Sequence, residues 1–195
     1  INGYLEDFFY KTSRFIFNEN IPTEIKPIVS VLRIIPDYIK NFFNSAELHY
    51  PEQDKNDINF LAYCLKEENI TALQIEEKLI ENYKSKIEID NPEQYTKNIN
   101  KIRKYIDNFD PETHIEKIKE SEYKLTSIDL NLLNMSFNVG IIYINDNNNK
   151  YSYEFYENQS NKYIILYNHY DELRNSKLGC IKLNDKYINT LETIR

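Results

Sequence analysis

The chain has 195 residues, a formal net charge of −7 and a pI near 5.1, with 41% hydrophobic and 28% charged residues. This length is enough for one substantial core, and this composition is that of a globular protein rather than a disordered one. Contact with a nucleic-acid backbone depends on clustered lysines and arginines, so the acidic balance argues against nucleic acid as the partner.

The cysteines, glycines and apolar runs exclude several further classes of protein. Cys64 and Cys180 show no CxxC spacing, so we expect neither a disulfide framework nor a zinc site. Three glycines leave little room for a phosphate-binding loop, and no cofactor is expected. No apolar run approaches the ~20 residues that span a bilayer. Because the cysteines indicate no disulfide, we expect the protein in a reducing compartment such as the cytoplasm. This could be the cytoplasm of a host cell, or the protein could be part of a virion.

Residues 1–50 are predicted to form a helical N-terminal extension. The segment is rich in aromatic residues at helix-like spacing, and Pro22, Pro27 and Pro36 divide it into short pieces. Because the chain begins at Ile1 rather than Met, we expect it to be a piece of a longer protein.

Residues 51–195 are predicted to form an α+β domain, with helices in the N-terminal two-thirds packed on a small, mostly antiparallel sheet formed late in the chain. A capping box of Thr71 and Gln74 starts one of these helices. The predicted helices lie from about residue 58 to 65, at 72–84, within 95–109 and at 127–138, and the predicted strands at 141–144, 151–155, 162–167 and 181–183.

The apolar run before His169 ends at the one site-like pair in the sequence. Imidazole is the side chain best suited to move a proton near neutral pH, and Asp171 is placed to orient it through a hydrogen bond. A histidine beside an acid at a strand end is also common as an ordinary surface residue, so these residues leave both interpretations open. The other two histidines, His49 and His114, show no ligand spacing, and we expect no metal site.

Three short segments carry a resemblance to a known family. Residues 168–171 read Asn-His-Tyr-Asp after the strand, residues 54–57 read Asp-Lys-Asn-Asp before the first helix, and residues 138–140 read Asn-Val-Gly before another strand. This order resembles the ovarian-tumour (OTU) family of cysteine proteases, which remove ubiquitin. In that family an Asp-Gly-Asn-Cys segment starts a helix and a late strand delivers His-Tyr-Asp. The resemblance covers about residues 50–183 and implies an OTU-like fold and ubiquitin or another protein as partner.

The cysteine of the first family motif is missing here. Its position corresponds to Asp57, Ile58 or Asn59, none of which can form a thiolate. We favour Asn59, which precedes His169 by 110 residues. Cys64 follows on the same predicted helix, and we expect it to be a small buried hydrophobic residue rather than the nucleophile.

The resemblance implies how an active form would work and leaves two classes of function open. A cysteine near position 59 would attack the isopeptide carbonyl, His169 would transfer the proton, and Asp171 would steady the ring. As the chain stands, one hypothesis is an inactive deubiquitinase-like domain that binds ubiquitin or another protein, its cysteine lost naturally or replaced. The alternative is a structural or interaction module of a larger viral or parasite protein, which the abundance of Asn, Lys and Tyr favours.

Overall fold

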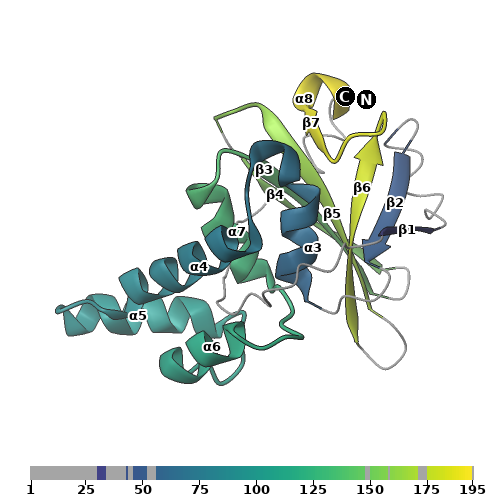
Figure 1. Cartoon of the computed structure of the whole chain (residues 1–195). Helices are drawn as coiled ribbons and strands as arrows, with labels where there is room; N and C mark the ends of the chain where they lie inside the picture. The colour runs from purple at the N-terminus through teal and green to yellow at the C-terminus, as the bar shows by residue number, and fades with distance from the viewer. Residues whose placement is uncertain are drawn as a thin grey trace.

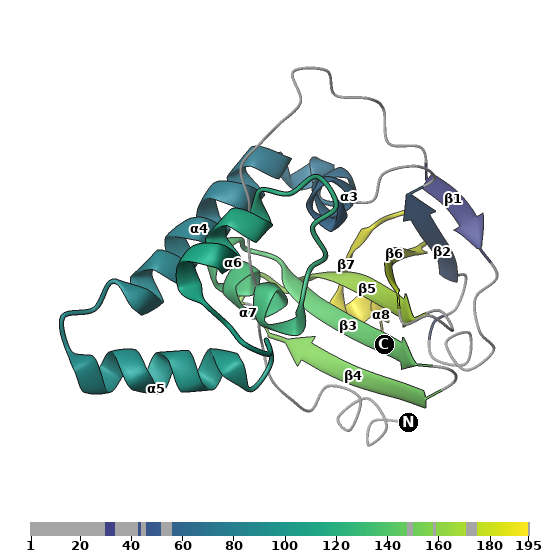
Figure 2. The same ribbon diagram turned by 90° about the horizontal axis from the view of Figure 1, so that it is seen from below.

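The computed structural model describes residues 30–33, 43, 46–51, 56–147, 150–157, 159–170 and 175–194. Within these residues, one mixed sheet is covered on one face by helices, and a long helical arm extends from it (Figure 1). The same arrangement is seen from below in Figure 2, where α3 (Asp57–Cys64), α4 (Ala72–Ile87), α6 (Pro111–Ile118) and α7 (Ser127–Ser136) lie on one side of the strands. The predicted α+β class is confirmed.

The described strands form a seven-stranded sheet in the order β1-β2-β6-β5-β3-β4, with β7 pairing with β5. The pair β3 and β5 is parallel, and the other pairs are antiparallel. The strands are β1 (Ser30–Arg33), β2 (Ala46–Pro51), β3 (Gly140–Asn147), β4 (Lys150–Tyr156), β5 (Lys162–Tyr170), β6 (Ser176–Leu183) and β7 (Ile188–Thr190).

Strand β5 is apolar along most of its length because both of its faces are buried. Ile164 and Leu166 belong to the main core, which lies between the sheet and the helices; we call this side the helix face. Tyr163, Ile165 and Tyr167 belong to a smaller core on the other side, which we call the second face. Successive residues of a strand point to opposite faces, so this alternation assigns every side chain of β5 to one face.

The helices are α3 (Asp57–Cys64), α4 (Ala72–Ile87), α5 (Pro92–Arg103), α6 (Pro111–Ile118), α7 (Ser127–Ser136) and α8 (Leu191–Ile194), with a 3₁₀ turn η1 (Lys66–Glu68). Four of them begin after a side chain that accepts hydrogen bonds from the first turn: Asn56, Thr71, Asn91 and Asp110. These caps satisfy backbone donors that have no partner inside the helix.

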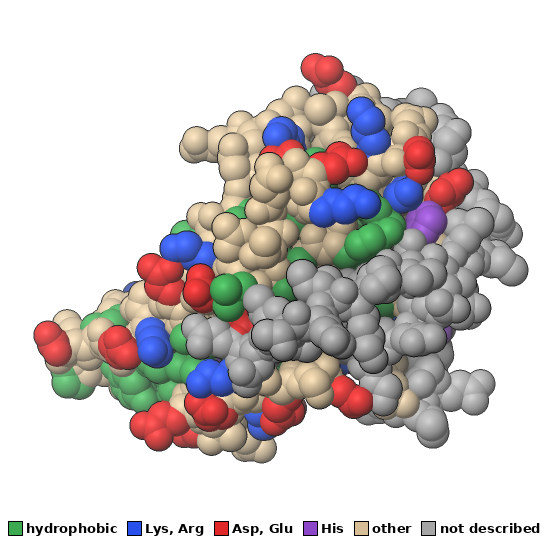
Figure 3. Space-filling view, viewed as in Figure 1, with side chains coloured by type: hydrophobic (Ala, Val, Ile, Leu, Met, Phe, Trp, Pro, Cys, Tyr) green, Lys and Arg blue, Asp and Glu red, His purple; other side chains and the backbone are tan. Residues whose placement is uncertain are grey.

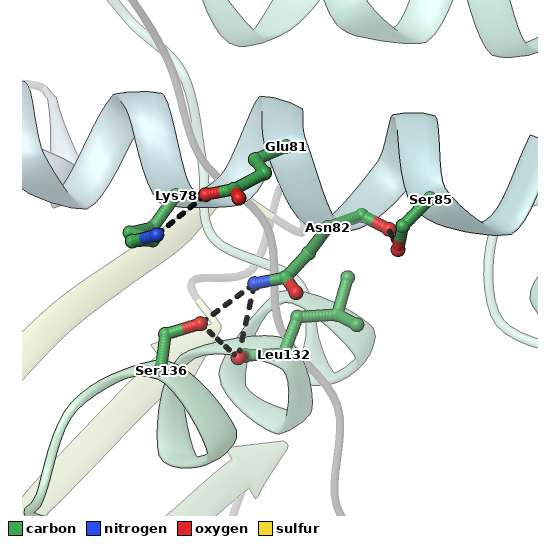
Figure 4. Close-up of polar contacts among 6 residues, drawn as sticks. All are labelled: Lys78, Glu81, Asn82, Ser85, Leu132 and Ser136. Atoms are coloured by element: carbon green, nitrogen blue, oxygen red, sulfur yellow. Dashed lines mark hydrogen bonds and ion pairs between the residues drawn. The ribbon is translucent and has the colours of Figure 1, made fainter. Parts of the chain in front are cut away.

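Polar side chains join α4 to α7, as Figure 4 shows. The Nδ2 atom of Asn82 donates to Ser136 Oγ at 2.7 Å and to the carbonyl of Leu132 at 3.4 Å. Ser136 Oγ in turn donates to the Leu132 carbonyl at 3.0 Å. Ser85 and the pair Lys78 and Glu81 make their bonds within α4 itself. The long helix is therefore anchored to the helix face through its middle.

Several sequence predictions are confirmed at the level of single residues. Helix α4 begins at the capping box, in which Gln74 N donates to Thr71 Oγ1 and Thr71 N donates to Gln74 Oε1. Helix α3 matches the predicted helix from residue 58. Helix α7 begins at Ser127, the first residue of the predicted range 127–138, and Thr126 is its cap.

The structure describes residues 30–33, 43 and 46–50 of the predicted helical extension 1–50. Apart from the single residue Phe43, the helical prediction is wrong there. Residues 30–33 and 46–51 are strands, since β2 pairs with β6 and β1 with β2. Leu48 and Tyr50 alternate with more exposed residues and pack on the second face. The other residues of the segment, apart from Phe43, lie outside the described residues. The boundary between residues 50 and 51 stays a prediction, although β2 runs across it.

Candidate functional site

Helix α3 begins at Asp57, which defines where a helix-starting nucleophile would sit. Asn56 Oδ1 accepts hydrogen bonds from Ile58 N at 2.8 Å and from Asn59 N at 3.2 Å, so Asn56 is the cap. The partial positive charge of a helix N-terminus lowers the pKa of a thiol placed there. Asp57 and not Asn59 is therefore the first residue of the helix, and Asn59 lies within its first turn.

The Asp57 carboxylate is buried and ties α3 to the segment before α7. Only 4% of the residue is exposed. Its Oδ2 atom accepts from Leu125 N at 3.0 Å, its Oδ1 atom pairs with Lys124 Nζ at 2.9 Å, and its own backbone N–H donates to the Tyr123 carbonyl at 3.2 Å. A carboxylate held in this way has a structural role at one of the three positions where the resemblance places the nucleophile.

His169 lies at the end of β5, where its ring meets an acid that the sequence analysis did not single out. The Nδ1 atom is 3.1 Å from Asp146 Oδ2. The parallel pairing of β3 and β5 sets Asp146 directly beside His169. Asp171, which was expected to orient the ring, lies outside the described residues. In the sequence, Asp146 follows one apolar strand as His169 follows another, and this was the available signal. The sequence does not show that the two strands are parallel neighbours in this register.

Asp146 also accepts a hydrogen bond from Tyr167 OH at 2.7 Å, on the same oxygen. Asp146 is 5% exposed, and the His169 side chain is 45% exposed. Burial, and then the Asp146 carboxylate, raise the pKa of Tyr167 far above its usual range, so this hydroxyl stays protonated and acts as a donor. The three side chains form a small polar network in which one nitrogen of the imidazole is held.

This network lies on the second face, whereas α3 packs on the helix face. Tyr167 belongs to the smaller core. His169 lies two residues further along the strand, so its side chain points to the same face, and both side chains contact Asp146. Ile58 and Phe60 of α3 belong to the main core. The sheet therefore separates the His169 ring from the helix that carries Asn59. The structure brings His169 to Asp146 and does not bring it to Asn59.

Tyr170 of β5 lies on the helix face, the side of the sheet on which α3 packs. Burial raises the pKa of Tyr170, and the carboxylates of Glu154 and Asp57 add to this effect, which places Asp57 within electrostatic range of the phenol. Asn168, the neighbour of Tyr170 on the same face, donates from Nδ2 to Asn145 Oδ1 at 3.2 Å. The expected catalytic histidine therefore does not lie on the helix face at this end of β5. Tyr170 lies there instead, beside the hydrogen-bonded side chains of Asn168 and Asn145.

Both cysteines are buried free thiols of the main core. Cys64 lies in the last turn of α3, and burial, together with a hydrogen bond to Cys180, raises its pKa well above the usual value. A buried thiol with a raised pKa supplies little thiolate. The prediction that Cys64 is a small buried hydrophobic residue is confirmed.

The other two histidines each make their own local contacts. Among the residues that the structure describes, no three His, Cys, Asp or Glu side chains are grouped closely enough to hold a metal ion. His49 pairs with Glu47 at 3.2 Å, and His114 is buried among aromatic rings. In the described part of the chain, no helix has the length and apolar character needed to cross a membrane.

Comparisons with protein-family models, with curated proteins and with solved structures give no significant match to this chain.

Proposed function

We propose that this chain is an OTU-like, ubiquitin-directed domain that binds ubiquitin or another protein and has no cysteine-protease activity. One observation carries this proposal: the start of α3, where the resemblance places the nucleophile, holds the buried carboxylate of Asp57. Both thiols of the chain are buried elsewhere in the core, so neither can act in place of the missing cysteine.

The observed helix start also supports a register for the first motif. In the OTU family the cysteine starts the helix and follows an asparagine. Here Asn56 caps α3 and Asp57 is its first residue, so Asp-Lys-Asn-Asp aligns with Asp-Gly-Asn-Cys and Asp57 takes the place of the cysteine. Asp57 is therefore a better candidate for that position than Asn59, which the sequence analysis favoured.

The arrangement fits a binding role better than hydrolysis. His169 and Asp146 form a pair that could handle a proton, but among the residues that the structure describes no nucleophile on the helix face can reach that pair through the sheet. A domain of this kind would hold its partner without cleaving it. Two free cysteines next to each other in the core fit a reducing compartment, such as the cytoplasm of a host cell or a virion.

Two measurements with ubiquitin test the proposal. Ubiquitin carrying a thiol-reactive group at its C-terminus should leave the chain unlabelled, because no reactive thiolate is available. Isotope-labelled ubiquitin titrated with the chain should show saturable chemical-shift changes. Covalent labelling would contradict the claim of inactivity, and an absence of shifts at millimolar concentration would contradict ubiquitin binding.

A second candidate is a structural or interaction module with no catalytic ancestry. The observation that favours it is the placement of the His169 ring on the face opposite α3, since a protease derived from the family motif needs both on one side. The titration separates the two candidates, because a module of this class has no reason to bind ubiquitin.

A further inference from the structure

A groove runs along the exposed side of α4. Two hollows, of about 830 and 480 Å³, both border on Lys84 and Glu88 and therefore lie next to each other along α4. The larger one is bounded by the end of α4, the beginning of α5 and helix α6. The smaller one continues toward Glu77, eleven residues before Glu88, which corresponds to about 17 Å of helix at 1.5 Å per residue.

The groove has an apolar floor. Ile87 and Ile115 are half-buried, Tyr95 is 38% exposed, and Ile80 lies at the edge of the core at 8% exposure. These side chains come from three different helices, and they lie along one side of α4 because α5 and α6 both pack against it. An apolar strip of this kind offers anchoring positions for the apolar face of another helix.

The rim of the groove is acidic. Six carboxylates and two lysines line the two hollows, a net charge of −4: Glu77, Glu81, Glu88, Asp110, Glu112 and Glu116, with Lys84 and Lys119. Within the described part of the chain, Glu77, Glu88 and Glu112 make no ion pair. Figure 3 shows apolar side chains among acidic and basic ones over the end of the molecule formed by α4, α5 and α6.

We propose that this groove, which we call the α4 groove, binds a basic amphipathic helix of a partner protein. An apolar strip selects the apolar face of such a helix, and an acidic rim selects lysines and arginines beside it. The length of the groove matches about three helical turns. This inference goes beyond the proposed function and does not depend on ubiquitin binding.

The charges of the chain argue against other occupants. A second copy docked through the same face would bring two acidic rims together, and the whole chain carries a net charge of −7. A nucleic acid would place phosphates against carboxylates. Of these classes of partner, a basic protein segment is the one whose charge and apolar character both complement the groove.

The probe for the test is a fluorescent 14-residue peptide of leucine and lysine, with leucines spaced to form one helical face. Its control is a scrambled peptide of the same composition, which has the same charge but no apolar face. Binding to the full chain is followed by fluorescence anisotropy. The groove variant is Glu88→Lys with Glu112→Lys, and the matched control is Glu67→Lys with Glu192→Lys, which changes the net charge equally at exposed positions outside the groove.

We expect the groove variant to bind the amphipathic peptide about tenfold more weakly or worse, and the control variant to bind within about twofold of the parent. A second variant, Tyr95→Ala, should also weaken binding without changing the charge. Circular dichroism verifies that each variant is folded. Equal weakening by both charge variants, or equal binding of the scrambled peptide, would overturn the proposal, since either result would mean that total charge alone attracts the probe.

Discussion

His169 Nδ1 lies 3.1 Å from Asp146 Oδ2, on the face of the sheet that α3 does not cover. The pair results from the parallel register of β3 and β5, which sets these two residues side by side. The same carboxylate oxygen accepts a hydrogen bond from the hydroxyl of Tyr167, so the imidazole, the carboxylate and the phenol form one network. The position of this network determines whether His169 could activate a cysteine introduced at the start of α3.

A cysteine introduced at the start of α3 should not be activated by His169. We expect Asp57→Cys and Asn59→Cys to give thiols whose alkylation by iodoacetamide has the same pH dependence with and without His169→Gln, because the sheet separates the ring from the helix. The parent chain, in which both cysteines are buried, gives the background rate. If His169→Gln raised the thiol pKa by one unit or more, the imidazole would have to reach the helix face.

Asp57→Ala should lower the free energy of unfolding by about 1 to 3 kcal/mol, because it leaves the backbone N–H of Leu125 without its acceptor. The matched variant Lys124→Met removes only the partly exposed ion pair and should cost less than about 1 kcal/mol. Urea unfolding measures both. An equal cost for the two variants would show that the ion pair, and not the backbone bond, is the stabilising contact.

Gly140→Ala should destabilise the chain although alanine is usually the better residue in a strand. A Cβ atom at Gly140 would overlap ring atoms of Tyr163 and lie 2.9 Å from the carbonyl oxygen of Tyr156. We expect a loss of about 1 to 3 kcal/mol in thermal or urea unfolding, as for other overpacked sites. Ser152→Ala, at an exposed position of β4, is the control and should change stability by less than about 0.5 kcal/mol. If Gly140→Ala left the free energy of unfolding unchanged, Tyr163 and its surroundings would have to move aside easily.

Acidification should destabilise the chain through His114. Burial, and to a lesser extent Lys117, lower the pKa of His114 to about 4. The unfolded chain takes up this proton near pH 6.5 and the folded chain only near pH 4, so stability is lost as the pH falls between these values. The expected loss from this group by pH 4.5 is about 2 to 3 kcal/mol.

The variant His114→Phe isolates this effect. It keeps an aromatic ring beside Phe109 and Tyr83, and Tyr123 OH still donates to Asp129. Burial raises the pKa of Asp129, so the folded state favours the protonated form of this carboxyl, and its contribution has the opposite sign to that of His114. Urea unfolding at pH 7 and at pH 4.5 should therefore show a smaller acid loss in His114→Phe than in the parent. Identical losses would mean that other groups cause the destabilisation.

Much of the helical part could be predicted because its signals are local. Thr71 and Gln74 satisfy each other within one turn, and the apolar spacing after them can only form a helix. Helix α6 was missed, although Asp110 followed by Pro111 is a helix-start signal of the same kind. In the N-terminal segment, helix-like spacing was misleading, because pairing with β6 through β2 made strands of residues 30–33 and 46–51.

The sequence by itself determined the α+β class, the start of α3 within two residues, the apolar strand that ends at His169, and the absence of a thiol at the helix start. These features depend on residues a few positions apart, whose hydrogen bonds and periodicity do not require the rest of the chain. The tertiary structure alone decided that Asp146 accompanies His169, that this pair lies across the sheet from Asn59, and that three helices enclose an acidic groove. Such relationships depend on strand register and helix packing between distant segments, and a one-residue change of register would have turned His169 to the other face.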